Sequence, residues 1–231
     1  MPRERTDFIR ESGSKDKEKI IVLAYEGADT ERLYFEAVKN CHRFNKDLIE
    51  LHALKRPPGD HASSPRHVFS KLKREAKDEY NFGPKDELWM VIDTDRWRNI
   101  PEIVAECQTQ KNMFAAVSNP CFELWLLLHR QDISGFDAAQ TDAILKNRKN
   151  GGRRTHVERL LMAALGGSYN KSNIRADDFI PGLDQAIIQA KDRDAAGEDY
   201  PTVVGSHVYK IVEKIILPGI AAAFMIEAEE P

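Results

Sequence analysis

The sequence predicts an α/β protein, with a mostly parallel sheet flanked by helices and a helical C-terminal extension. Up to about residue 130, apolar runs typical of strands alternate with amphipathic stretches typical of helices. A βαβαβαβα order of this kind favours parallel strands with helices on both faces of the sheet. Beyond residue 130 the strand patterns nearly vanish, and helical patterns follow one another between glycine-rich or polar breaks.

Four segments are expected to form the sheet. Residues 19–25 are a continuous apolar run bounded by charge and glycine, as in strands buried on both faces. Residues 48–54 alternate more between apolar and polar side chains, so this strand is expected nearer an edge. The remaining strands are predicted at 88–92 and 113–117.

Helices are expected where apolar residues recur every three or four positions. In the first half of the chain these stretches are 30–40, 66–80, 101–110 and 122–129. In the second half they are 137–148, 154–165, 183–194 and 203–217.

These patterns divide the chain into three parts. Residues 1–19 are dense in mixed charge and lack apolar periodicity, so a flexible arm is expected there. Residues 20–130 are expected to form the α/β core, and residues 131–231 a helical extension packed on it.

Composition narrows the class of protein. The formal net charge of −3 argues against a uniformly basic nucleic-acid-binding protein but is compatible with a local basic face. Cys41, Cys107 and Cys121 are widely spaced and show no zinc-type spacing, so free thiols in a reducing cytoplasm are expected. The apolar run at 124–128, like the other apolar runs of the sequence, is too short to cross a bilayer, so no membrane span is expected.

Acidic residues follow two of the predicted strands. Glu26 follows the first strand, and Asp93 and Asp95 follow the third. Ligands of open parallel sheets bind beyond the carboxyl ends of the strands, and positions i and i+2 of an extended segment point to the same side. Oxygen-only ligands favour Mg²⁺, or else Mn²⁺, over zinc, and such ions polarise phosphates and activate water.

Other roles for these acids remain open from the pattern alone. Asp93 and Asp95 could belong to a strand-terminal turn, and Glu26 could be a helix-dipole partner or a general acid or base. Glu31, one turn into the first helix, is either a carboxylate that supports the metal ligands or binds a second metal, or an acid compatible with the helix dipole. Glu123 follows the fourth strand and could join the same metal cluster.

Three sequence blocks resemble the RloB-like family, which is related to Toprim domains and is encoded near prokaryotic restriction and phage-defence loci. The blocks are Tyr-Glu-Gly-Ala-Asp-Thr-Glu at 25–31, Val-Ile-Asp-Thr-Asp at 91–95 and Ser-Asn-Pro-Cys-Phe-Glu-Leu-Trp-Leu-Leu-Leu-His at 118–129. The third is the most specific because it is twelve residues long. The resemblance covers roughly residues 20–217, weakly in the later helices.

The resemblance implies a Toprim-like core and specific residue roles. Glu26 matches the Toprim glutamate that ends the first strand, and Asp93 and Asp95 match the Asp-x-Asp pair that holds Mg²⁺. Related Toprim nucleases of the OLD type use such acids for metal-dependent strand cleavage. The resemblance also suggests a lysine at Lys171 that could stabilise developing phosphate charge, although a surface lysine is the simpler interpretation.

The resemblance further implies an AAA-type ATPase as a partner. The chain carries no Walker A motif, so ATP hydrolysis would come from that partner. No nucleophilic tyrosine can be identified, so hydrolysis is favoured over strand passage or ligation.

A basic segment at 146–154 is the main candidate for binding nucleic acid. It contains two adjacent glycines and five cations, which are Lys146, Arg148, Lys149, Arg153 and Arg154. A mobile cationic loop suits a phosphate backbone, because these contacts need positive charge but no base specificity. A solvated surface loop is the alternative. The position of this segment relative to the acidic residues discriminates between the two.

Three functional hypotheses follow. The first is a Mg²⁺-dependent nuclease acting on DNA or RNA, tRNA included, as an anti-phage defence effector. The second is a non-catalytic Toprim-like module that binds a phage component or regulates an AAA-type ATPase. The third is a small-molecule phosphotransferase or nucleotide hydrolase. A homo-oligomer is compatible with each of them.

Overall fold

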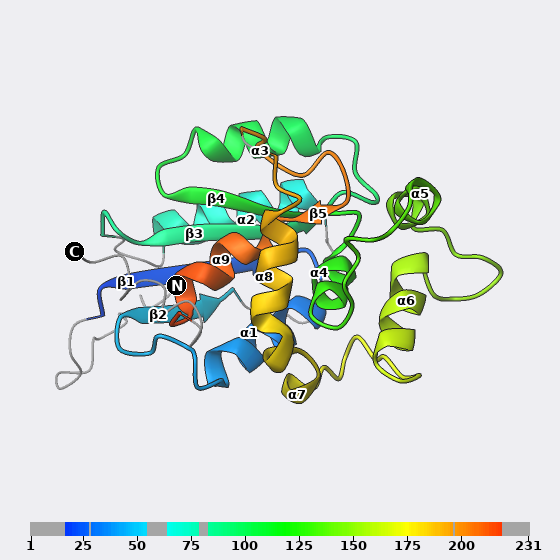
Figure 1. Ribbon diagram of the computed structural model, residues 1–231. Helices are drawn as coiled ribbons and strands as arrows, with labels where there is room; N and C mark the ends of the chain where they lie inside the picture. Colours follow the sequence, from blue (N-terminus) through cyan, green and yellow to red (C-terminus); the bar gives the residue numbers. More distant parts are fainter. Residues whose placement is uncertain (1–16, 28, 55–63, 79–82, 196, 219–231) are drawn as a thin grey trace, which may run out of the picture.

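The computed structural model describes residues 17–27, 29–54, 64–78, 83–195 and 197–218 (Figure 1). The predicted flexible arm at 1–19 lies almost wholly outside these residues, as does the C-terminal end of the predicted extension. Among the described residues, no helix combines the length and the apolar character needed to cross a membrane.

A five-stranded sheet forms the centre of the described structure, in the order β2-β1-β3-β4-β5. Its first four strands are parallel, and the short β5 is antiparallel to β4. The predicted mostly parallel sheet is therefore confirmed, and the 48–54 segment forms an edge strand as expected. The bounds of the strands are β1 Lys19–Tyr25, β2 Ile49–Ala53, β3 Glu87–Asp93, β4 Met113–Asn119 and β5 Gly205–Ser206.

Helices cover both faces of the sheet, as the βα order predicted. The helices of the first half are α1 Thr30–Asn40, α2 Pro65–Asp78, α3 Ile100–Gln108 and α4 Phe122–Leu128. Those of the second half are α5 Ala138–Lys146, α6 His156–Ala164, α7 Ala176–Phe179, α8 Leu183–Lys191 and α9 Val208–Ile215, with a short 3₁₀ turn, η1, at Ile180–Gly182.

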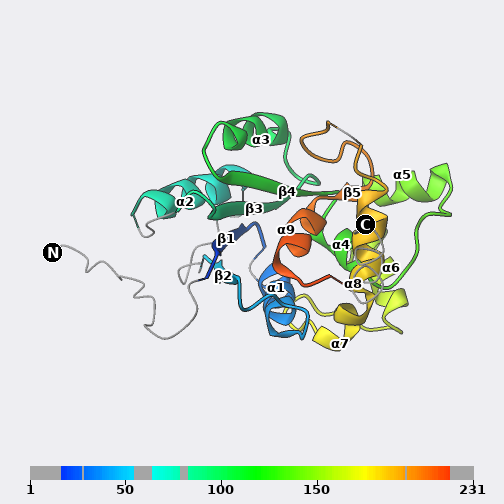
Figure 2. The same ribbon diagram turned by 60° about the vertical axis from the view of Figure 1, so that its left-hand side comes forward.

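The layers follow from the alternation of side chains along the buried strands. In β1, Val22 and Ala24 point into the core beneath α2 and α3. Ile21, Leu23 and Tyr25 point to the opposite core, which contains α1, α4, α8 and α9 (Figures 1 and 2). A strand with both faces buried must be apolar at every position, which explains the unbroken apolar run in the sequence.

The 203–217 segment differs from its predicted helix. Its first residues form β5 at the edge of β4, and the helix begins only at Val208. Two contacts hold the strand: the Ser118 and Ser206 hydroxyls lie 2.9 Å apart, and the His207 N–H donates to the Val117 carbonyl at 2.9 Å. The edge of β4 offers backbone partners that only the folded chain can supply, so helical periodicity did not reveal this strand.

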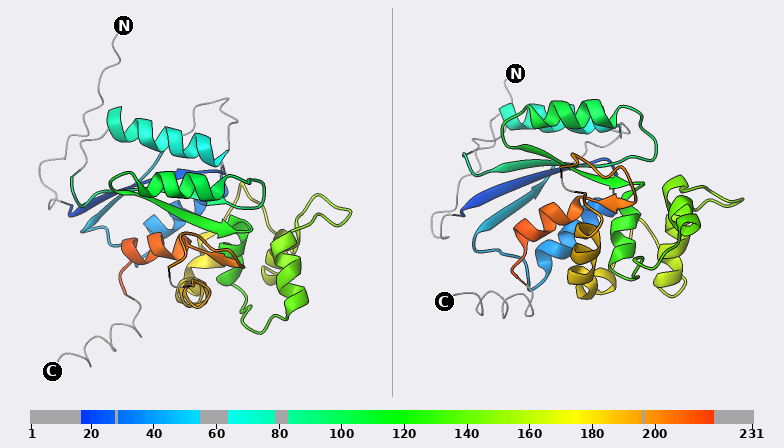
Figure 3. Two further views of the ribbon diagram at one scale, coloured as in Figure 1. Left: turned by 90° about the horizontal axis from the view of Figure 1, so that it is seen from above. Right: turned by 45° about the horizontal axis from the view of Figure 1, so that its top comes forward.

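The helices α5 and α6 lie beyond the carboxyl ends of the parallel strands, beside α4 (Figures 1 and 3). Ile144 of α5 and Leu161 of α6 are buried in the same core as α4. This packing brings the segment between α5 and α6 to the end of the sheet where the predicted acidic site lies.

Candidate active site

A pocket of about 810 Å³ opens at the carboxyl ends of β1 and β3. Its acidic lining residues are Glu26, Asp29, Glu31, Asp93, Asp95, Glu123 and Glu158. Its basic lining residues are Arg96, Lys149, Arg153, Arg154 and Lys171. The tertiary structure thus brings together every acid predicted from the sequence, the candidate lysine and part of the basic segment.

Glu26 is fixed between the two strands that form the floor of the pocket. Its backbone N–H donates to the Val91 carbonyl at 3.0 Å, which continues the pairing of β1 with β3. Its Oε1 accepts from Trp97 Nε1 at 2.7 Å, and its Oε2 accepts from the Asp93 backbone N–H at 3.1 Å. Burial raises the pKa of Glu26, and these two donors oppose that shift.

The loop that carries Asp93 and Asp95 is held by the turn at 118–120. The Asp95 N–H donates to the Pro120 carbonyl at 3.1 Å, and the Thr94 hydroxyl donates to Asn119 Oδ1 at 2.8 Å. The Asn-Pro of the third sequence block therefore positions the aspartates rather than entering the site itself.

Burial raises the pKa of both aspartates. For Asp93, the neighbouring carboxylates Glu31 and Glu26 raise it further, well above its usual range. For Asp95, Arg96 opposes the effect of burial, with its Nε 3.6 Å from Asp95 Oδ1. Charge repulsion in this pocket therefore favours either bound protons or a cation.

Glu31 points into the pocket from the first turn of α1. Its Oε1 accepts from the Gly27 backbone N–H at 2.9 Å, and only 4% of the residue is exposed. Burial, with contributions from Glu123 and Glu26, raises the pKa of Glu31 to about 7.

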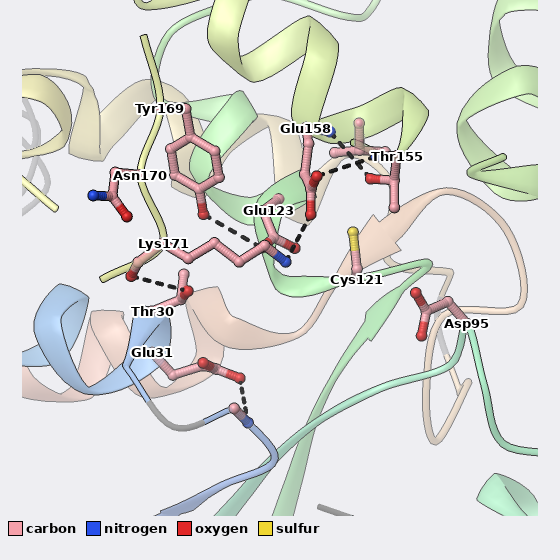
Figure 4. Close-up of polar contacts among 12 residues, drawn as sticks. Thr30, Glu31, Asp95, Cys121, Glu123, Thr155, Glu158, Tyr169, Asn170 and Lys171 are labelled. Carbon is pink, nitrogen blue, oxygen red and sulfur yellow. Dashed lines mark hydrogen bonds and ion pairs between the residues drawn. The ribbon is translucent and has the colours of Figure 1, made fainter. Parts of the chain in front are cut away.

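Glu123 and Glu158 both form an ion pair with Lys171, and Glu158 was not among the site residues predicted from the sequence. Lys171 Nζ lies 2.7 Å from Glu123 Oε1 and 2.7 Å from Glu158 Oε1 (Figure 4). Tyr169 donates its hydroxyl to Glu123 at 3.3 Å. Burial raises the pKa of Glu158, but the pair with Lys171 outweighs this and lowers it overall.

Besides Glu158, the sequence did not reveal Trp97, which contacts Glu26, or Arg96, which lines the pocket; it carries a signal only for Glu158. Glu158 is the glutamate of a Thr-x-x-Glu capping box, a recognisable pattern, and is the third residue of α6. Trp97 and Arg96 follow the aspartates directly in sequence, but no spacing rule distinguishes them from surface residues.

The basic segment at 146–154 divides between the pocket and the surface. Lys149, Arg153 and Arg154 line the pocket, whereas Lys146 pairs with Asp142 on α5 and Arg148 is not part of the lining. Asn147 adopts a left-handed conformation with φ of 40°, which ends α5 and changes the direction of the chain between Lys146 and the residues that line the pocket.

The donor chemistry of the pocket fits a hard divalent cation such as Mg²⁺, because carboxylate oxygens dominate it. The residues that would hold the ion are Glu26, Asp93 and Asp95, with Glu31 and Glu123 as further ligands. Among the described residues, however, no three acidic, His or Cys side chains stand together as a group that could hold a metal. Several of these carboxylates are instead engaged by N–H donors or by Lys171.

Comparison with known proteins agrees with the resemblance seen in the three sequence blocks. No curated protein and no solved structure gave a significant match. A family profile described as RloB-like protein matches residues 21–215. This range includes all the lining residues of the pocket, the described helices from α1 to α9, and the described strands apart from the first two residues of β1. The chain therefore belongs to the RloB-like family.

Proposed function

We propose that the protein is a metal-dependent nuclease that hydrolyses phosphodiester bonds of DNA or RNA, with tRNA among the candidate substrates. One observation carries this proposal, namely that carboxylates and cations line the same pocket. Carboxylates alone would repel a nucleic acid, and cations alone would bind it without chemistry. Their combination suits a site that binds a polyanion and acts on its phosphates.

The cations of the pocket are proposed to bind the substrate backbone. Lys149, Arg153 and Arg154 offer positive charge without base-specific groups, which suits contacts to phosphate oxygens. Lys171 is proposed to face the charge that develops on the phosphate once substrate is bound.

The carboxylates are proposed to form the catalytic centre. Glu26, Asp93 and Asp95 would hold Mg²⁺, or Mn²⁺ in its place, and Trp97 keeps Glu26 turned toward the pocket. The bound ion would supply polarisation of the phosphate and activation of the attacking water. Glu26 is buried, which strengthens its electrostatic effect, whereas Asp93 is half-buried and Asp95 is exposed.

A role as an anti-phage effector with an AAA-type ATPase partner extends the proposal. Its support is the family membership, together with the lack of a Walker A motif in the chain. Under this extension the ATPase would control when the nuclease acts.

A second candidate is a non-catalytic Toprim-like module that binds a phage component or regulates an AAA-type ATPase. The observation that favours it is the lack of a ready metal-binding group among the described side chains. This candidate predicts that a divalent cation stabilises the fold without any turnover of nucleic acid.

The test is a cleavage assay with labelled single-stranded DNA, duplex DNA and total tRNA, in Mg²⁺, Mn²⁺ or EDTA. Asp93→Asn removes one carboxylate from the pocket with little change of shape. Asp47→Asn makes the same chemical change at an exposed position outside the pocket and serves as the control. We expect metal-dependent cleavage by the wild type and by Asp47→Asn, and loss of at least about a hundredfold in Asp93→Asn.

Two outcomes would count against the nuclease. Cleavage that persists in Asp93→Asn would indicate a contaminant or another site. Silence of the wild type, both alone and with an AAA-type ATPase encoded beside it, would favour the binding module.

A further inference from the structure

Lys171 occupies a position between two buried carboxylates that a simple surface lysine would not take. Its Nζ lies 2.7 Å from an oxygen of each, although half of its side chain, 49%, remains exposed. The side chains of Glu123 and Glu158 are 7% and 9% exposed. Buried carboxylates are costly unless a cation compensates them, and Lys171 supplies that cation.

The backbone around Lys171 is tied across the pocket to the start of α1. The Thr30 hydroxyl donates to the Lys171 carbonyl at 3.3 Å (Figure 4). The Ser172 hydroxyl donates to Asp29 Oδ2 at 3.0 Å. On its other side, Tyr169 contacts Glu123. These contacts hold the segment 169–172 on both sides of Lys171, so the folded backbone fixes the position of the lysine.

The same arrangement means that Glu123 is already paired with a cation. In Figure 4 the Lys171 ammonium lies between Glu123 and Glu158, and Glu31 and Asp95 stand apart from it. With the ammonium in contact with its Oε1, and the Tyr169 hydroxyl on the same oxygen, Glu123 already has a cation and a donor.

We propose that Lys171 is a built-in counter-cation that competes with the divalent metal for Glu123, so that Glu123 becomes a metal ligand only when Lys171 moves away. The inference rests on the proposed function in one respect, that a metal binds in this pocket. Before substrate binds, Lys171 then acts on metal binding through Glu123, and Glu158 retains the lysine nearby, where it can later face the substrate phosphate.

Replacing Lys171 should change the metal affinity in opposite directions, depending on whether the lysine competes with the metal or only stabilises the pocket. If Lys171 only stabilised the pocket, replacing it would weaken metal binding along with the fold. If it competes, replacing it with a neutral side chain removes the competitor and tightens metal binding. Loss of any positive charge near the pocket also favours a metal, so a control of equal charge is needed.

The first test is a calorimetric titration of Mn²⁺ into the wild type, Lys171→Met and Lys149→Met. Lys149 lines the same pocket, so its variant loses the same charge without the contacts to Glu123 and Glu158. We expect Lys171→Met to bind Mn²⁺ about tenfold more tightly than the wild type. Lys149→Met is expected to gain about threefold at most, since its charge is not in contact with these carboxylates.

The outcomes separate this inference from the proposed function. Mn²⁺ binding by the wild type with no gain, or a loss, in Lys171→Met would overturn the inference and leave the metal site intact. An equal gain in both variants would overturn it as well, because general electrostatics would then account for the effect. No Mn²⁺ binding by any of the three proteins would refute the metal site itself and, with it, the inference.

A second measurement uses the wild type alone and does not depend on the folding of a variant. Lysines are acetylated with a water-soluble reagent, with and without saturating Mn²⁺, and the sites are quantified by mass spectrometry. Lys171 is expected to react several-fold faster with Mn²⁺, because the metal frees its ammonium from the carboxylates. Lys191, which pairs with Glu213 outside the pocket, should be unchanged. An unchanged or slower reaction of Lys171 would contradict the competition.

Discussion

Lowering the pH from 7 to 5 is expected to destabilise the protein through His129. This residue ends α4 and is almost fully buried. Its Nδ1 lies 2.8 Å from the Phe179 carbonyl oxygen, to which it donates, and its Nε2 lies 3.3 Å from the Tyr34 hydroxyl. Burial lowers the pKa of His129 to about 3, because the apolar and aromatic surroundings disfavour the charged imidazolium.

The magnitude follows from the two pKa values of this histidine. In the unfolded chain its pKa is close to 6.5, so by pH 5 the unfolded state has bound a proton that the folded state excludes. The unfolded state then binds more protons, so stability falls as the pH falls. At 1.36 kcal/mol per pH unit, the free energy of unfolding decreases by about 2 kcal/mol between pH 7 and pH 5, and it continues to fall toward pH 3.

Other buried groups act in the opposite direction, so the test compares two proteins rather than two pH values. The pKa of Glu31 is raised to about 7 in the folded state, above its unfolded value of 4.5. Its folded form takes up a proton first, which increases stability as the pH falls through this range. The contribution of His129 is therefore isolated by the difference between the wild type and His129→Gln, which cannot titrate.

Urea unfolding of both proteins at pH 7 and pH 5 measures that difference. The wild type is expected to lose about 2 kcal/mol more than His129→Gln on acidification, whatever the stability of the variant at pH 7. An equal change in the two proteins would refute the argument, since it would mean that His129 titrates normally in the folded state.

Two further predictions concern the orientation of a site residue and the packing beneath the site. Trp97→Phe removes the N–H donated to Glu26 and is expected to weaken Mn²⁺ binding about tenfold in a calorimetric titration of the folded variant; unaltered affinity would contradict an orienting role. Gly182→Ala would place a methyl group 1.9 Å from the carbonyl oxygen at the end of α4, so we expect a loss of about 2–3 kcal/mol in urea unfolding. Gly135→Ala, where nothing lies within 4 Å, is the control and should change stability by less than about 0.5 kcal/mol.

The strands and the acids at their ends could be predicted from local patterns. β1 and β3 are buried on both faces, and such strands must be apolar throughout, so each is visible as a continuous run. Glu26 and Asp93 interrupt or end those runs with charge, and the parallel order of the strands places both at one edge of the sheet. These features depend on residues close together in the sequence.

The partners of those acids were decided only by the tertiary structure. Trp97 and Glu26 are 71 residues apart in the sequence, and Tyr169 and Glu123 are 46 apart. The pair between Lys171 and Glu158, like the division of the basic segment between pocket and surface, depends on how α6 and the loop after it pack against α4. Periodicity reports which face of an element is buried, but it carries no information about which distant element covers that face. The sequence alone therefore predicts which acidic residues lie at the ends of the strands. The packing of the second half of the chain determines which residues form ion pairs or hydrogen bonds with them.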